Sequence, residues 1–337
     1  MRPSPHRDEL LGFLSTRHDE SAAERALPVD PRRTEHPATL VLVDAAADLP
    51  RSLAAHAALR VLPLSLRLHG RRLRDARVAR ARLDGARLRQ ARVELPDAAE
   101  LAWRLHPNLA LNADVLIALD DLLGDASAAL QQMIAAHDAE IRELRASRGL
   151  PGTLTLHRID CGGAFAVPAL HARVLLHELE RGRASAELVA LAARLPRATR
   201  QWLLPRTPRQ LGATLQGCAT SRLQPWRDAC GGSALLSGLP LLYGDADGLR
   251  CDARVHGWAR ALDALCAQVH DALRARAQLQ LSYDGSVAEL SAQPAVDALR
   301  AHAAQLGVTL HITHMSVAAR VRAGAGALAV ALLDQDA

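Results

Sequence analysis

The stretch LVLVDAAADLP, residues 40–50, contains a buried strand and the loop that follows it. Four apolar residues lead into Asp44, and three alanines then precede Asp48-Leu49-Pro50. A short apolar run that ends at turn residues is typical of a strand buried on both faces. We predict a first strand at 39–43. The loop after it has few reactive or polar side chains, because alanine cannot donate a hydrogen bond, act as a nucleophile or bind a polar ligand.

Strands and helices alternate along the rest of the chain. Further strands are expected at 60–70, 113–119, 152–160, 278–283, 308–314 and 326–333, and a pair of strands around the turn DADG within 235–257. Helices are expected at 53–59, 76–92, 97–105, from the third strand through 147, and at 165–181, 185–195, 258–277 and 292–306. This alternation predicts an α/β fold with mostly parallel sheets covered by helices.

The chain length of 337 residues favours two domains. Residues 1–38 are polar and rich in proline, arginine and glutamate, which predicts a flexible N-terminal extension. We expect an N-terminal α/β domain at 39–160 and a C-terminal α/β domain at 161–337.

The composition argues against several function classes. Net charge is +5, but the arginines are scattered and aromatic residues make up only 2%, so no nucleic-acid partner is expected. The one basic block, 70–92, is read as a solvated helical surface. Five cysteines without a C-x-x-C pair predict no metal site, and the motifs give no cofactor. No signal peptide and no membrane span are expected, so we predict a cytoplasmic protein.

A series of segments resembles one family in sequence order. LVLVDAAADLP is similar to the opening of the DegV family, a strand followed by D-S-T-x-D-L-P. Segments that resemble later DegV motifs are LRVLPLSLRLHGRRLRD (59–75), DVLIALDDLLGDASAAL (114–130), LTLHRIDCGGAF (154–165), ELERGRASAELV (178–189), LLSGLPLLYGDADGLRCDARVHGWARAL (235–262) and RVRAGAGALAVALL (320–333). The resemblance covers roughly residues 39–333.

The resemblance implies a two-domain α/β fold with a ligand cleft between the domains. It also implies that a fatty acid or other acyl ligand is bound there, and that a separate fatty-acid kinase subunit is a candidate partner. The ligand-binding positions that it implies are Ala45, Ala46, Val93, Glu94, Leu119, Asp120, Asp125, Cys161, Arg322 and Gly324.

The polar end of the implied site departs from the family. Hydroxyl positions hold Ala45, Ala46 and Cys161, and the final histidine position holds Arg322. Four acids lie near the lost hydroxyls: Glu94, Asp120, Asp121 and Asp125. Acids repel a carboxylate at low dielectric.

Other roles are open for these charged residues. Asp120 or Asp121 is expected to cap the next helix, since aspartate is a preferred N-cap. Asp44 and Asp48 are expected to form turns. Arg322 either holds an anion or pairs with one of the acids and closes the pocket.

Three hypotheses follow. The first is an acyl-binding protein without catalytic residues of its own. The second is a scaffold of the same fold with a filled pocket, which acts through protein contacts. The third is an enzyme that uses Arg322 and the four acids on a small anionic substrate, which requires those acids to converge in an open cleft.

Overall fold

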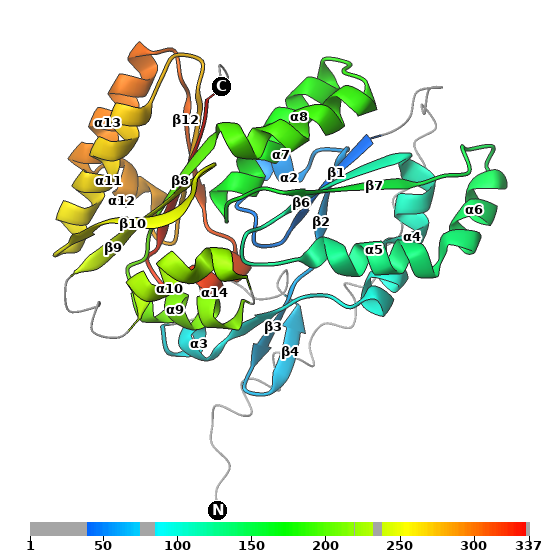
Figure 1. Ribbon diagram of the computed structural model, residues 1–337, viewed down its shortest axis with the longest axis horizontal. Helices are drawn as coiled ribbons and strands as arrows, with labels where there is room; N and C mark the ends of the chain where they lie inside the picture. Colours follow the sequence, from blue (N-terminus) through cyan, green and yellow to red (C-terminus); the bar gives the residue numbers. More distant parts are fainter. Residues whose placement is uncertain (1–38, 75–84, 219, 232–237, 335–337) are drawn as a thin grey trace, which may run out of the picture.

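The computed structural model describes residues 39–74, 85–218, 220–231 and 238–334. The predicted extension 1–38 and most of the first half of the predicted helix 76–92 therefore lie outside the described residues. Two halves lie side by side, each built on its own sheet (Figure 1). The boundary at residue 160 stays a prediction, although the first sheet does end with Asp160.

The first sheet has four strands in the order β2-β1-β6-β7, all parallel. Its strands are β1 (Thr39–Asp44), β2 (Leu59–Leu62), β6 (Val115–Asp120) and β7 (Thr155–Asp160). Every residue of β1 is buried, as its apolar run predicted. Because parallel strands place their carboxyl ends at one edge, Val43 pairs with Leu119 and Asp120 pairs with Asp160 at the same edge.

Alternate residues of this sheet pack into two different cores. Val41 and Ile117 face the core shared with α7 (Ala166–Glu180) and α8 (Ser185–Ala198). Leu42 and Leu116 belong to the core formed with α4 (Ala98–Asn112) and α5 (Ala126–Ala136). Helices thus cover both faces, which explains the continuous apolar strands. The helix predicted to continue through 147 is divided at His137, after which α6 (Asp138–Ala146) begins.

The second sheet has six strands in the order β10-β9-β8-β13-β11-β12. They are β8 (Thr199–Leu204), β9 (Leu239–Asp245), β10 (Gly248–Val255), β11 (Gln278–Tyr283), β12 (Leu310–His314) and β13 (Leu328–Leu333). The α/β class is confirmed, but in this sheet only β11 and β12 run parallel. The two-residue turn between β9 and β10 requires an antiparallel pair, and β13 runs antiparallel to both of its neighbours.

The segment predicted as one strand at 60–70 is two strands in two sheets. Its first part is β2, and after Pro63 the chain enters β3 (Ser65–Leu68) of a small antiparallel sheet with β4 (Arg71–Arg74) and β5 (Arg92–Glu94). The helix predicted at 53–59 is only the short α2 (Arg51–Ala54), since Leu59 already begins β2. The remaining helices are α3 (Gly85–Gln90), α9 (Pro208–Gly217), η4 (Ser221–Leu223), α10 (Gln224–Cys230), α11 (Trp258–Ala272), α12 (Val287–Ser291), α13 (Pro294–Gln305) and α14 (Val317–Ala323).

Asp48 joins the two halves. Its carbonyl oxygen accepts hydrogen bonds from Gln280 Nε2 on β11 at 2.9 Å and from Thr313 Oγ1 on β12 at 3.3 Å. Its carboxylate Oδ1 accepts from the backbone N–H of Ser316, the N-cap of α14, at 2.7 Å. The sequence predicted a local turn former here, and that was wrong: the side chain bonds to a residue in the other half of the chain.

Burial strongly raises the pKa of the Asp48 carboxyl group. The side chain is buried, and desolvation raises its pKa from 3.8 to about 8. The folded protein therefore holds a proton that the unfolded chain releases near pH 4. Stability linked to this proton is complete below pH 4 and is lost as pH rises through about 8.

We predict that Asp48→Asn makes stability less dependent on pH. The amide oxygen can still accept from Ser316, but no charge has to be buried. The wild-type free energy of unfolding should fall between about pH 6 and pH 9, and at about pH 9 the variant should be more stable by at least about 1 kcal/mol. Urea titrations at several pH values measure this. Asp263→Asn, on the exposed face of α11, is the control and should keep the wild-type slope; an equal slope in Asp48→Asn would contradict the assignment.

Candidate functional site at the strand ends

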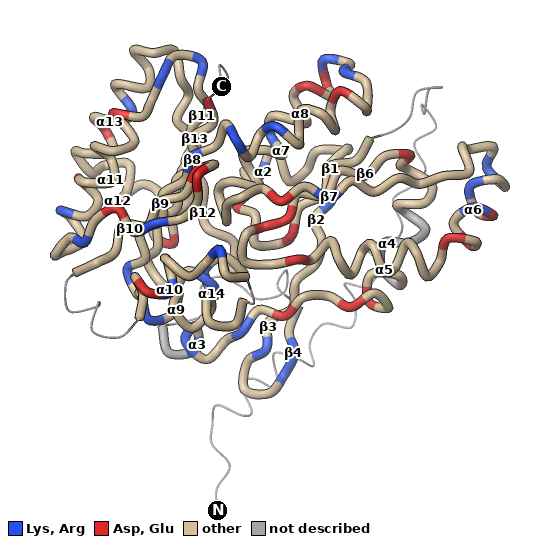
Figure 2. Tube along the Cα trace, in the orientation of Figure 1, with Lys and Arg blue, Asp and Glu red and all other residues tan. Residues whose placement is uncertain are grey.

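Arg322 lies at the edge where β1 and β6 end. It belongs to α14, whose C-terminal end is fixed by a hydrogen bond from Thr214 Oγ1 to the Arg322 carbonyl at 2.9 Å. Its Nη1 is 3.5 Å from Asp44 Oδ2 and 3.6 Å from Asp121 Oδ1. Figure 2 shows acidic positions gathered near these strand ends, between the two halves. The prediction that Arg322 pairs with one of the acids is confirmed for Asp121.

The two carboxylates are oriented by backbone amides. Asp44 Oδ1 accepts from the N–H of Ala46 at 2.9 Å, which confirms its predicted role in the turn. Asp121 accepts from the N–H of Leu123 at 2.7 Å and from that of Phe165 at 3.0 Å. Phe165 has a φ of 57°, which L-residues rarely adopt, and this conformation belongs to the turn before α7 that directs its amide to Asp121.

Hydrogen bonding in this cluster is incomplete. Asp44 Oδ2, Asp48 Oδ2 and Arg322 Nη1 are buried and have no hydrogen-bond partner among the described residues. The contacts of Arg322 with Asp44 and Asp121 are longer than the 2.7–2.9 Å of a good charge-assisted hydrogen bond. Arg322 is therefore a buried cation with unused donor capacity.

Burial and like charge set the protonation of the cluster. Desolvation, helped by the charge of Asp44, raises the pKa of Asp121 to about 6, while Arg322 opposes the shift. Burial also raises the pKa of the Cys161 thiol well above its ordinary value, so this cysteine stays a neutral thiol rather than a nucleophile. Asp48, with its pKa of about 8, is protonated at neutral pH, whereas Asp121, with its pKa of about 6, is mostly ionised there.

Four of the predicted head-group positions are buried. Ala46 is 0% exposed, Leu119 2%, Cys161 1% and Arg322 4%. A Cβ on Gly124 would lie 2.7 Å from Arg322 Nη2, so the guanidinium lies against the Gly124 backbone. Arg322 fills this site and closes it in the structure described here.

Asp120 and Asp125 face a different neighbour. Ser127 Oγ donates to Asp120 Oδ2 at 2.7 Å, and Arg158 forms ion pairs with both acids. Asp125, rather than Asp120 or Asp121, is the N-cap of α5, where it accepts from the N–H of Ala128 at 3.2 Å. The capping role predicted for Asp120 or Asp121 is therefore wrong.

Three other predicted positions lie on β5 or directly after β1. Glu94, on β5, forms ion pairs with Arg67 and Arg72. Val93, on the same strand, packs with the core around Val321. Ala45 follows β1 and is partly buried.

Gly324 ends α14 with a φ of 91°, and a Cβ there would lie 2.1 Å from Thr207 Oγ1. Only glycine permits this approach, which holds the end of α14 against α9. The four acids named from the sequence do not converge in an open cleft, so the geometry does not support the enzyme hypothesis.

Asp121 was expected only as a helix cap or as one of four acids, but it is a direct contact of Arg322. Successive side chains along a strand point to opposite faces, and β6 ends with Asp120 directed to Ser127 on α5. The next residue, Asp121, faces the α7 side, where Phe165 and Arg322 lie. This alternation was a usable signal. The short helix that carries Arg322 was not predicted either, although Ser316 is a regular N-cap that accepts from the N–H of Ala319.

No protein-family model and no curated protein matches the sequence. Among solved structures, the chain is similar to a fatty-acid-binding DegV family protein of Thermus thermophilus, with 19% identity, a TM-score of 0.67, and 88% of this chain and 99% of that chain covered. It is similar to a stearic-acid-binding protein of Eubacterium ventriosum, with 12% identity, a TM-score of 0.68, and coverages of 88% and 98%. It is also similar to a DegV family protein of Eubacterium eligens loaded with heptadecanoic acid, with 13% identity and a TM-score of 0.66, and 88% of this chain and 100% of that chain are covered.

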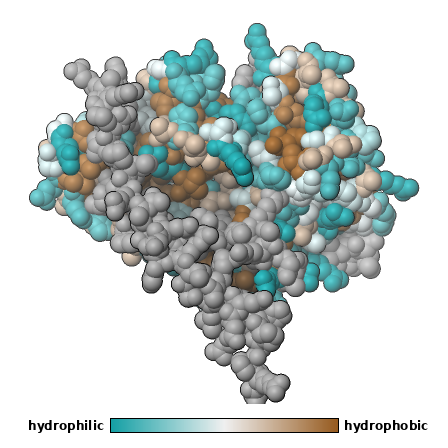
Figure 3. Space-filling view, turned by 180° about the vertical axis from the view of Figure 1, so that it is seen from behind, coloured by the Kyte–Doolittle hydropathy of each residue, from teal (hydrophilic) through white to brown (hydrophobic). Residues whose placement is uncertain are grey.

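In the part of the chain that the structure describes, no helix is both long and apolar enough to cross a membrane. On the face shown in Figure 3, hydrophobic residues reach the surface in separate areas between hydrophilic ones. The ordered resemblance in the sequence is thus confirmed in three dimensions, and the chain has the two-domain α/β fold of the DegV family.

Proposed function

We propose that the protein binds a long-chain fatty acid, or a related acyl ligand, between its two halves, with Arg322 as the anchor of the ligand's head group. The fold supports this proposal, because similar structures covering 88% of the chain are fatty-acid-binding proteins. The observation that carries it is the buried Arg322 guanidinium, whose Nη1 has no hydrogen-bond partner among the described residues.

A carboxylate suits this guanidinium better than its present neighbours. Arginine and a carboxylate form two parallel hydrogen bonds of about 2.7–2.9 Å when the geometry is free to adjust. Asp44 and Asp121 cannot adjust in this way, because backbone amides hold both side chains. A mobile ligand can therefore replace them as the partner of Arg322.

The binding energy would come mainly from the chain. Each buried methylene contributes about 0.8 kcal/mol, so a long acyl chain compensates for an imperfect head-group site. The core that both sheets share includes Leu122, Leu123 and Met315. Because Arg322 fills the head-group position, binding requires this side chain to turn away from Asp44 and Asp121.

The same closure favours a second candidate, a scaffold with a filled pocket. Its supporting observation is that Arg322 and the surrounding strand-end residues have almost no exposed surface. Such a protein would act through contacts with other proteins and bind no acyl ligand, so a binding measurement separates the two candidates.

We also propose a protein partner, a fatty-acid kinase subunit. The DegV resemblance implies that a separate kinase subunit acts on the bound carboxyl group. This stays a prediction, and it is testable by incubating the ligand-loaded protein with a bacterial fatty-acid kinase catalytic subunit and ATP, and following acyl phosphate formation.

We predict that delipidated protein binds one equivalent of palmitate, measured by native mass spectrometry, and that Arg322→Gln weakens binding by about tenfold, since a charge-assisted pair is lost. Arg320→Gln is the matched control, because Arg320 lies on the same helix but pairs with Asp284. It should bind palmitate as the wild type does. Binding of 1-hexadecanol, which has the same chain and a neutral head, should be unaffected by Arg322→Gln.

Two results would contradict this assignment of the acyl site. Wild-type protein that stays ligand-free with palmitate and with oleate would contradict acyl binding and favour the scaffold. Equal losses of palmitate binding in Arg322→Gln and Arg320→Gln would show that α14 is needed only structurally, and would remove Arg322 as the anchor.

We also predict that palmitate binding weakens as pH rises from about 6 to about 8. A bound carboxylate raises the pKa of Asp121 further above about 6, so binding takes up a proton and is favoured at lower pH. Asp121→Asn should bind palmitate about three- to tenfold more tightly at about pH 8 and with a flatter pH profile. Displacement of a fluorescent fatty acid measures these affinities.

Asp125→Asn is the control for this pH dependence. Asparagine keeps the helix cap, and Asp125 pairs with Arg158 rather than with Arg322. An unchanged pH profile in Asp121→Asn would sink the proposed proton uptake.

A further inference from the structure

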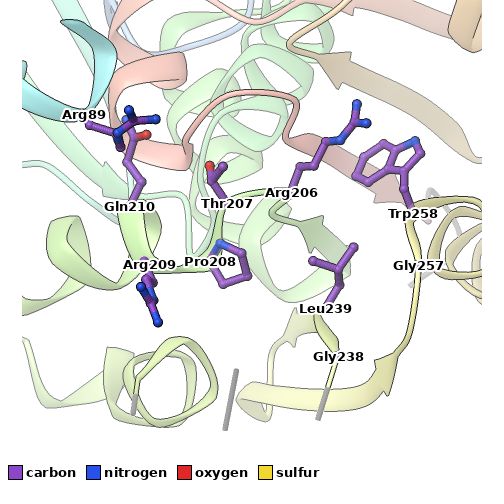
Figure 4. A pocket seen from close by; sticks show the side chains of 10 residues that line it. All are labelled: Arg89, Arg206, Thr207, Pro208, Arg209, Gln210, Gly238, Leu239, Gly257 and Trp258. Atoms are coloured by element: carbon purple, nitrogen blue, oxygen red, sulfur yellow. The ribbon is translucent and has the colours of Figure 1, made fainter. Parts of the chain in front are cut away.

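A pocket of about 680 Å³ opens beside the N-terminal ends of α9 and α11. Its walls come from α3, the β8–α9 loop, α9, and the segments before β9 and α11, as Figure 4 shows. None of its lining residues belongs to the strand-end cluster around Arg322. Its size is in the range of small-molecule sites.

Within the described ranges of the chain, the lining of the pocket contains three cations and no acid. Arg89, Arg206 and Arg209 contribute to its walls, all three are exposed, and the structure gives none of them a carboxylate partner among the described residues. Some exposed arginines elsewhere do have an acid partner, as Arg142 has in Asp138. A concave surface with three uncompensated guanidinium groups attracts an anion.

Two helix ends add to the same positive field. α9 begins at Pro208 after Thr207, and α11 begins at Trp258 after Gly257. Neither end has a side-chain cap, and the Thr207 hydroxyl lies 3.5 Å from the Ala325 carbonyl instead. Both helix starts contribute the positive end of a helix dipole. At α9, Pro208 has no N–H and the Gln210 N–H donates to the Thr207 carbonyl at 3.0 Å, so the dipole rather than a row of free N–H groups is what α9 adds.

One side of the pocket is apolar. Trp258, Leu239 and Pro208 line it, and the Arg206 guanidinium lies 5.4 Å from the centre of the Trp258 ring. In Figure 4 Arg206 reaches toward Trp258 at one end of the pocket, while Arg89 and Gln210 lie at the other. The pocket therefore has room for an organic group beside the cations.

These features together point to a ligand with more than one negative charge and an organic substituent. A carboxylate carries one charge and two acceptor oxygens, whereas a phosphate monoester carries close to two charges and three terminal oxygens, which match several arginines at once. We propose that this pocket is a binding site for a phosphate monoester of a small organic molecule, separate from the acyl site.

Isothermal titration of the full chain with phenyl phosphate, inorganic phosphate and phenol tests the proposal. Phenyl phosphate should bind with a Kd of about 1 mM or below, at least about threefold more tightly than inorganic phosphate, and phenol should give no saturable heat. Binding should weaken as sodium chloride is raised, because the attraction is ionic.

Arg206→Gln and Arg209→Gln should each weaken phenyl phosphate binding at least about threefold. Arg194→Gln is the matched control, since Arg194 is an exposed arginine on α8, away from the pocket, and its affinity should be that of the wild type. All three side chains are exposed, so circular dichroism should show folded variants.

Three results would overturn the proposal. One is no saturable heat with phenyl phosphate, and another is binding that Arg206→Gln and Arg209→Gln leave unchanged or that Arg194→Gln weakens equally. The third is equal affinity for phenyl phosphate and inorganic phosphate, which would remove the organic ester as the ligand class. Palmitate binding should be wild-type in Arg206→Gln and Arg209→Gln, so a failure here is distinguishable from a failure of acyl binding.

Discussion

A carboxyl group with almost no exposed surface fixes how the two sheets meet. The backbone carbonyl of Asp48 receives hydrogen bonds from Gln280 and Thr313, and its side chain receives one from the N–H of Ser316. A buried donor left without an acceptor costs about 1–3 kcal/mol, so the loop after β1 cannot leave the second sheet without leaving these donors unsatisfied. Since Ser316 begins α14, the same contact also determines where Arg322 lies.

In the strand-end cluster, apolar residues occupy positions where the DegV resemblance implied hydroxyl groups. Ala46 now packs with Leu42 and Ala318 in an apolar core. Arg322 lies between the two acids Asp44 and Asp121, so a single cation faces both of them. This arrangement is stable enough to close the site, but the long contacts and unpartnered buried atoms leave it open to exchange with a ligand that makes better hydrogen bonds.

The sequence predicted the parts of the fold whose signals are local. The two central strands of the first sheet, β1 and β6, are continuous apolar runs because helices cover both of their faces. The absence of hydroxyl groups at Ala45, Ala46 and Cys161, where the DegV resemblance implies them, could also be read directly from the sequence. Strand β8 has no turn residues before it and was missed. Strand direction in the second sheet depends on pairings between distant segments, and the Asp48–Ser316 contact spans 268 positions, so neither leaves a local pattern. The sequence left two alternatives for Arg322, holding an anion or pairing with an acid. Only the distances to Asp44 and Asp121 show that it lies beside acids.

The last strand of the chain occupies the middle of the second sheet. β13 is the only strand that connects β10-β9-β8 to β11-β12 within the described sheet, because it pairs with β8 on one side and with β11 on the other. During synthesis, the two parts of this sheet remain unjoined until β13 emerges from the ribosome. Arg322 emerges only a few residues earlier, so the nascent protein completes its second sheet and its strand-end cluster almost together, and no translation product that stops before α14 contains either one.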